Sequence, residues 1–207
     1  MSDRYKTVLL FGAPGTGKGT QGNILGQIPG FFHLACGDVF RSLDTTSELG
    51  QEFLKYSSKG ELVPDSLTVE MWRQNMHAKT VLSLFKPRSD LLVLDGIPRS
   101  LPQAETLDSY IEVLRVIHLV CKDKDEMVKR MKQRAIKENR LDDADESVIR
   151  KRFQVYDDET SPVLSHYSSE LIREVDAIGS PARVLEHVLE ELVPVQDEHF
   201  HNPLGGN

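Results

Sequence analysis

The chain carries near its start the stretch Gly12-Ala13-Pro14-Gly15-Thr16-Gly17-Lys18-Gly19-Thr20. It directly follows the apolar run Thr7–Phe11, which is typical of a strand buried on both faces. Gly12, Gly17 and Lys18 satisfy the spacing of a phosphate-binding P-loop between a strand and a helix. In such a loop the glycines let backbone N–H groups turn toward a phosphate, and the next helix adds the positive end of its dipole. The stretch therefore predicts a P-loop with Lys18 as its mobile charge.

The position after Lys18 departs from the common motif, because Gly19 stands where a Mg²⁺-binding hydroxyl is usual and Thr20 comes one residue later. Mg²⁺ keeps several of its waters and can be held through them. Asp95 ends the apolar run Leu91–Leu94, and the carboxyl end of a strand borders the ligand crevice of an open α/β sheet. We expect Asp95 to hold nucleotide-bound Mg²⁺ through water; the alternative is an Asp that only starts a turn.

The rest of the chain alternates between strand-like and helix-like segments. Further apolar runs cover residues 31–35 and 116–120, and helical spacing covers Asp125–Lys137, Glu146–His166 and Ala182–Leu192. This alternation predicts an α/β fold: a parallel sheet with helices on both faces. Residues 194–207, which include Pro203 and two glycines, are expected to form a flexible tail.

Composition limits the classes of function. A chain of 207 residues can bury about 70% of its surface in a single core. Its net charge of −7 disfavours a protein that coats nucleic acid or an anionic membrane. Cys36 and Cys121 lie outside any C-x-x-C pair, so neither a disulfide framework nor a structural zinc site is expected. Because no apolar run is long enough to span a membrane and no leader precedes the first strand, we expect a cytoplasmic protein.

Four further motifs follow the P-loop in order. They are Leu-Ala-Cys-Gly-Asp-Val-Phe-Arg (34–41), Gly-Glu-Leu-Val-Pro (60–64), Leu-Asp-Gly-Ile-Pro-Arg (94–99), and the arginine-rich stretch 134–156. With the P-loop they resemble the adenylate kinase family of nucleoside monophosphate kinases, over about residues 6–193. The resemblance implies a P-loop NTPase-type fold in one domain, 1–193. It also implies two mobile inserts, a nucleoside monophosphate (NMP)-binding insert at about 35–63 and a short lid at about 133–143.

The same resemblance implies an activity and a set of site residues. The activity is reversible phosphoryl transfer from Mg·ATP to AMP, giving two ADP. The implied ATP-binding residues are Gly15, Thr16, Gly17, Lys18, Gly19, Thr20, Arg134 and Gly179. The implied AMP-binding residues are Cys36, Arg41, Glu61, Leu62, Val63, Gly96, Ile97, Pro98, Arg99, Gln103, Arg140 and Arg152. Lys18, Arg99, Arg134, Arg140 and Arg152 are the implied catalytic residues.

The chemistry of the residues agrees with this implication. Transfer between two nucleotides brings many phosphate charges together, and the attacking phosphate oxygen is already ionised, so charge neutralisation matters more than a general base. Arginine suits this task because its planar fork binds phosphate bidentately and stays charged. The alternative for Arg134, which lies at helical spacing from Arg130 and Lys137, is an ordinary solvated helix face. The surrounding motifs favour the functional interpretation.

Two positions bear on the acceptor base. Cys36 stands where the family motif usually has Thr, and a thiol is too weak a hydrogen-bonding group to settle the base. Gln103 offers a donor and an acceptor that match the edge of adenine, whereas UMP/CMP-type relatives usually have Asn there. AMP is therefore the expected acceptor, and a UMP/CMP-type kinase is the alternative.

Another alternative is an adenylate sensor that lacks catalysis. The presence of Lys18 and of all the implied catalytic arginines disfavours this alternative. Because only residues 135–139 separate Arg134 from Arg140, the expected lid is short. We also expect the protein to be a monomer and to lack a structural zinc ion.

Overall fold

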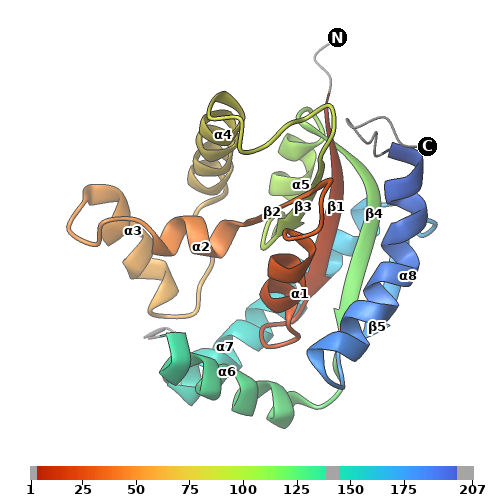
Figure 1. The fold of residues 1–207 in the computed structure, drawn as a ribbon. Helices are drawn as coiled ribbons and strands as arrows, with labels where there is room; N and C mark the ends of the chain where they lie inside the picture. Colours follow the sequence, from red (N-terminus) through yellow and green to blue (C-terminus); the bar gives the residue numbers. More distant parts are fainter. Residues whose placement is uncertain (1–3, 139–144, 200–207) are drawn as a thin grey trace.

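The computed structural model describes residues 4–138 and 145–199. Its centre is a five-stranded parallel sheet with the strand order β2-β3-β1-β4-β5 (Figure 1). The strands are β1 (Tyr5–Gly12), β2 (Phe31–Ala35), β3 (Leu91–Asp95), β4 (Ile111–Val120) and β5 (Ile172–Asp176). The expected α/β class with a parallel sheet is confirmed.

Helices cover both faces of the sheet because successive strand residues point to opposite sides. Val8 and Leu10 pack in the cluster that contains residues of α1 (Lys18–Leu25) and α8 (Pro181–His199). Leu9 and Phe11 pack in the cluster on the other side, with side chains from α4 (Asp65–Val81), α5 (Leu101–Leu107) and the 3₁₀ helix η3 (Ser161–His166). Burial on both faces explains why these strands lack alternation between apolar and polar residues.

Two short helices, α2 (Cys36–Arg41) and α3 (Glu48–Ser57), extend away from the sheet between β2 and α4 (Figure 1). Phe40 of α2 stacks on Phe53 of α3, with ring centroids 5.2 Å apart. Ser47 caps α3, because its Oγ accepts a hydrogen bond from the backbone N–H of Gly50 at 3.1 Å. These two helices make up most of the segment expected to be an NMP-binding insert.

A second pair of helices, α6 (Lys124–Glu138) and α7 (Glu146–Val155), lies beyond the carboxyl ends of the strands (Figure 1). Met131 of α6 and Ile149 and Phe153 of α7 form a buried cluster against which Ala13 of the P-loop packs. The predicted helix Asp125–Lys137 lies within α6. The predicted helix Glu146–His166 is present as α7, the π-helix η2 (Tyr156–Thr160) and η3 in succession.

The tail prediction is wrong for residues 194–199, because α8 continues to His199. Pro194 lies inside α8 and removes one backbone hydrogen bond, but it is exposed and the helix goes on beyond it. Val195 is buried against the sheet, and Nε2 of Gln196 donates to the carbonyl of Pro29 at 2.8 Å. These contacts hold the last turns on the core. Among the described helices, none is long and apolar enough to cross a membrane.

Candidate active site

The P-loop joins the end of β1 to the start of α1. Gly12 has φ +149°, and a Cβ at this position would lie 2.6 Å from the carbonyl oxygen of Leu119, so no other residue fits without movement of the backbone. The Oγ1 of Thr16 donates to the carbonyl of Ala13 at 2.8 Å, within the loop itself. α1 begins at Lys18 and presents the unpaired N–H groups of its first turn, which is the arrangement that binds phosphate.

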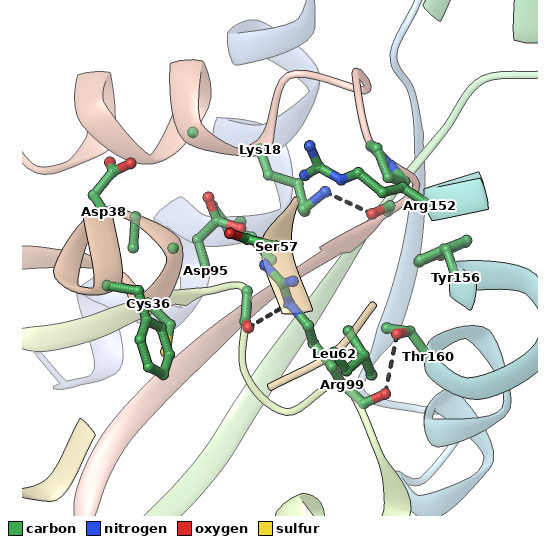
Figure 2. A pocket seen from close by; sticks show the side chains of 18 of the residues that line it. Lys18, Cys36, Asp38, Ser57, Leu62, Asp95, Arg99, Arg152, Tyr156 and Thr160 are labelled. Carbon is green, nitrogen blue, oxygen red and sulfur yellow. Dashed lines mark hydrogen bonds between the residues drawn. The ribbon is translucent and has the colours of Figure 1, made fainter. Parts of the chain in front are cut away.

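Lys18 points back over the loop, where its Nζ donates to the carbonyls of Gly12 at 2.6 Å and Ala13 at 3.1 Å (Figure 2). Burial lowers the pKa of Lys18 to about 8, although the Asp95 carboxylate opposes this shift. The positive charges of Arg99, Arg134 and Arg152 lower the pKa further. A phosphate at this position would bring negative charge to a cluster of cations and raise the pKa of the lysine back toward its usual value.

Asp95 is the last residue of β3 and is buried. A Cβ at Gly19 would lie 3.7 Å from Oδ2 of Asp95, which places this carboxylate beside the first turn of α1. A carboxylate next to a phosphate loop is an oxygen donor of the kind that Mg²⁺ prefers, so the residues present fit a nucleotide-bound magnesium ion. Within residues 4–138 and 145–199, no group of three or more His, Cys, Asp or Glu side chains could hold a metal ion.

Arg99 is fixed at both its side chain and its backbone. Its Nε donates to the carbonyl of Gly96 at 2.8 Å, and its own carbonyl accepts from Oγ1 of Thr160 at 3.0 Å. Figure 2 shows Lys18, Asp95, Arg99 and Arg152 converging on one hollow. They come from α1, β3, the loop after β3 and α7, so the sheet edge gathers groups that lie far apart in the sequence.

Arg152 and Arg41 approach from the helices outside the sheet. Gly60 has φ +71°, and a Cβ there would lie 2.9 Å from Cγ of Arg152, so the glycine allows the end of the α2–α3 segment to approach α7 closely. NH1 of Arg41 lies 3.2 Å from Oδ1 of Asp38 in an ion pair on α2. Both arginines border the same cavity as Lys18.

That cavity has a volume of about 380 Å³ and extends from the P-loop to Gln103. Five cationic side chains of the described residues line it: Lys18, Arg41, Arg99, Arg134 and Arg152. Further residues named from the sequence that line it are Gly15, Gly17, Gly19, Thr20, Cys36, Glu61, Leu62, Val63, Asp95, Gly96, Pro98 and Gln103. The structure therefore brings both implied nucleotide sites to one space.

Three of the named residues that the structure describes do not line this cavity. Thr16 is buried within the loop, and Ile97 is buried in the core cluster that contains α4 and α5. Gly179 is exposed after β5. Arg140 lies outside the described residues. Thr16 and Ile97 are therefore supports of the site in this structure, behind the groups that face the cavity.

The end of the cavity near Gln103 is largely apolar, with Phe40, Phe53, Leu62 and Val63 among its lining residues. Cys36 also faces it, and burial raises the pKa of this thiol to about 12, so Cys36 is a neutral group at pH 7. An apolar slot with a neutral thiol suits the faces of a flat heterocycle better than an additional charge.

Gln103 is almost fully buried, with 1% exposure, and both ends of its amide are bonded. Its Oε1 accepts from the backbone N–H of Arg99 at 2.8 Å. Its Nε2 donates to Oδ1 of Asp65 at 2.7 Å. Gln103 thus links the loop after β3 to the start of α4.

Sequence reasoning missed several residues of the site. Thr160 supports Arg99, Asp65 supports Gln103, and Tyr156 lines the cavity while its hydroxyl lies 3.0 Å from Nε2 of His118. The stacked pair Phe40 and Phe53 was missed as well. Phe40 falls inside the quoted segment 34–41 and Tyr156 ends the quoted stretch 134–156, so these two had a signal in the sequence; the other missed residues lie outside the quoted motifs.

A parallel sheet with a P-loop, facing arginines that converge from separate elements, defines a P-loop phosphotransferase of the nucleoside monophosphate kinase class. The family model described as adenylate kinase matches residues 10–172. The chain is 38% identical to the adenylate kinase of Kocuria rhizophila over 191 residues, covering 89% of this chain and 97% of that protein. It is 34% identical to the adenylate kinase of Thermus thermophilus over 193 residues, covering 90% and 96%. The chain belongs to the adenylate kinase family.

Proposed function

We propose that this protein catalyses reversible phosphoryl transfer from Mg·ATP to AMP, giving two ADP. The observation that carries the proposal is the ring of five cationic side chains around one cavity that joins the P-loop to Gln103. Such a ring can neutralise two phosphate chains held end to end, which a site for one nucleotide would not need.

On the donor side, the N–H groups of the P-loop and the Nζ of Lys18 bind the β- and γ-phosphates of ATP. The present contacts of Lys18 with the carbonyls of Gly12 and Ala13 keep its Nζ over the loop. Arg134 reaches the transferring group from α6, and Gly179 borders the adenine of ATP. Asp95 would hold the magnesium ion through water; when bound, that ion neutralises charge on the phosphates.

On the acceptor side, Arg41 and Arg99 bind the phosphate of AMP. Gly96 supports Arg99 through its carbonyl, which accepts from the guanidinium. Arg152, together with Arg140, closes over the transferring phosphoryl group. The AMP phosphate oxygen attacks the γ-phosphorus in line and needs no general base, because it is ionised at pH 7.

Gln103 recognises the base, and this favours AMP over the pyrimidine monophosphates of the alternative UMP/CMP-type function. The side chains of Leu62 and Val63 border the same end of the cavity. An edge of adenine carries one donor and one acceptor, which a single side-chain amide can satisfy. The neutral Cys36 thiol adds a contact without charge.

We also infer a single domain, expected at 1–193 and extended to His199 by the last turns of α8, with movable segments at about 35–63 and 133–143, acting as a cytoplasmic monomer. Closing of the segments around both nucleotides would exclude water, so that ATP alone is hydrolysed at a negligible rate. Sedimentation of the purified protein and fractionation of its source cells test the monomer and the compartment.

A coupled assay with ATP and each of AMP, GMP, CMP and UMP tests the function. We expect AMP to be the best acceptor and two ADP to form for each AMP consumed. A mimic that joins two adenosines through five phosphates should inhibit far more strongly than either nucleotide alone, because it fills both sites. Preference for CMP or UMP would establish the alternative, and release of phosphate without transfer would establish a hydrolase.

A further inference from the structure

The amide of Gln103 can present its donor and its acceptor to a purine in two opposite orders. Adenine presents a donor at N6 and an acceptor at N1, whereas hypoxanthine and guanine present an acceptor at O6 and a donor at N1. A glutamine amide free to turn by 180° about its last bond could pair with either edge, because turning exchanges its oxygen and nitrogen. A site that distinguishes the two kinds of purine through one glutamine therefore has to prevent this turn.

Two contacts of Gln103 prevent it. Oε1 accepts from the backbone N–H of Arg99 at 2.8 Å, and Nε2 donates to Oδ1 of Asp65 at 2.7 Å. A turned amide would place its oxygen against a carboxylate and its NH₂ group against an N–H, so both hydrogen bonds would become repulsive contacts. The side chain is 1% exposed, so little water is available to take their place.

The same two contacts leave hydrogen-bonding groups of the amide available to a base. A glutamine amide has two N–H donors and two acceptor positions on its oxygen, and the structure uses one of each. One donor and one acceptor position remain on a side chain that lines the cavity. Their order along the edge is fixed by which end is tied to Asp65 and which to Arg99.

Asp65 and the backbone N–H of Arg99 fix this order together, because the N–H only donates and the carboxylate only accepts. A carboxylate only accepts hydrogen bonds, so it can bind the nitrogen of the amide and never its oxygen. Asp65 is the first residue of α4, and it does not line the cavity that Gln103 lines. It therefore acts through Gln103. The other partner, the backbone of Arg99, is held in turn by the hydroxyl of Thr160 at 3.0 Å.

We propose that Asp65 is a positioning residue that fixes the polarity of the Gln103 amide and so sets the preference for 6-aminopurine over 6-oxopurine acceptors. This inference rests on the proposed function, because it assumes that the base of the acceptor monophosphate meets Gln103. Asp65 would then be a determinant of base specificity that does not itself line the cavity. The hydrogen-bonding type of residue 65, acceptor only or acceptor and donor, decides how strictly the base is selected.

The test is Asp65→Asn, assayed with AMP and with inosine monophosphate (IMP) as acceptors at saturating ATP. The two bases differ only at C6 and at the proton on N1. Asparagine has nearly the shape of aspartate and is well tolerated at helix starts, and it can bond Gln103 in either orientation. We expect the ratio of kcat/KM for AMP over IMP to fall by about tenfold, which corresponds to a change of about 1.4 kcal/mol in discrimination. The loss for AMP should appear in KM, with kcat nearly unchanged.

Glu48→Gln is the matched control. Glu48 is exposed in the first turn of α3, so its substitution removes a helix N-terminal charge from the neighbouring segment without touching Gln103. Its AMP/IMP ratio should equal that of the wild type. Asp65→Ser gives a second variant that also starts helices well and lacks the carboxylate, and its ratio should fall as well.

The outcomes separate the two proposals. If the wild type does not phosphorylate AMP, the proposed function fails. If it does, but Asp65→Asn and Asp65→Ser lower kcat/KM for AMP and IMP by the same factor, Asp65 has only a structural role and the inference is overturned. An unchanged ratio in both variants, or a wild-type ratio near one, overturns it as well.

Discussion

The P-loop at one end of the cavity is a single continuous run, residues 12–20, whereas the end around Gln103 collects side chains from α2, α4, α5 and the loop before α4. The P-loop presents mainly backbone N–H groups, which bind any phosphate. The other end presents side chains whose donor and acceptor order is set by neighbours such as Asp65. The contrast indicates that common phosphate chemistry can be bound by local backbone, while selection of a base requires tertiary packing.

The largest expected effect is a loss of kcat on substitution of Lys18, at the P-loop end of the cavity. Lys18→Met should lower kcat by on the order of 10³ while the fold remains, because the Lys18 charge is required where phosphate charge shifts during transfer. Steady-state kinetics and circular dichroism on one preparation check this. A variant that keeps a tenth of the wild-type kcat would show that Lys18 has no such role.

The next effect concerns the arginines that bridge the two ends. Arg152→Ala should lower kcat by on the order of 10², since Arg152 lines the cavity beside Lys18. Arg150→Ala is the matched control two positions earlier on α7. Arg150 is exposed and pairs with Glu146 and Asp125, so its loss should change activity by about twofold or less. Equal losses in the two variants would assign the effect to the stability of α7.

A smaller effect is expected at the base end. Gln103→Ala should raise KM for AMP by the equivalent of about 1–3 kcal/mol, because the polar edge of the base then lacks partners. KM for ATP should hardly move. Since Oε1 of Gln103 also holds the backbone N–H of Arg99, a moderate loss in kcat should accompany the change in KM. Similar increases of KM for both nucleotides would show general damage to the fold.

The smallest effect is a pH dependence of stability on the P-loop side. The pKa of Lys18 is lowered to about 8 from 10.5, so the cost of burying its charge is fully present below pH 8. Between about pH 8 and 10.5 the unfolded chain binds more protons than the folded one at this residue, and stability rises with pH. The free energy of unfolding of the wild type should therefore rise relative to that of Lys18→Met across this range.

Denaturant titrations at several pH values measure that difference. Cys36, whose raised pKa lowers stability as the pH rises from 9 toward 12, is present in both proteins and cancels in the comparison. A constant difference from pH 7 to 10.5 would show that the Lys18 amine is not desolvated.

Sequence patterns predicted the elements whose signals are local. The P-loop glycines, the buried strands and α6 fall where the residues indicated. The prediction failed at the last turns of α8, where Pro203 and the two glycines after it pointed to a tail from residue 194 onward. The helix continues because Val195 packs on the sheet and Gln196 bonds the carbonyl of Pro29, which lies 167 positions away. No local pattern carries that information.

The sequence by itself determined that this chain folds as a P-loop protein, because the loop is contiguous and its geometry depends on glycine backbone and on Lys18. It also indicated the arginines, since they lie inside motifs. Only the tertiary structure decided which groups hold the site residues in place. Asp65 and Gln103 are 38 positions apart, and Thr160 and Arg99 are 61 apart. Each pair meets because separate helices pack at the same end of the sheet, and hydrogen bonds require contact in space that spacing along the chain does not express.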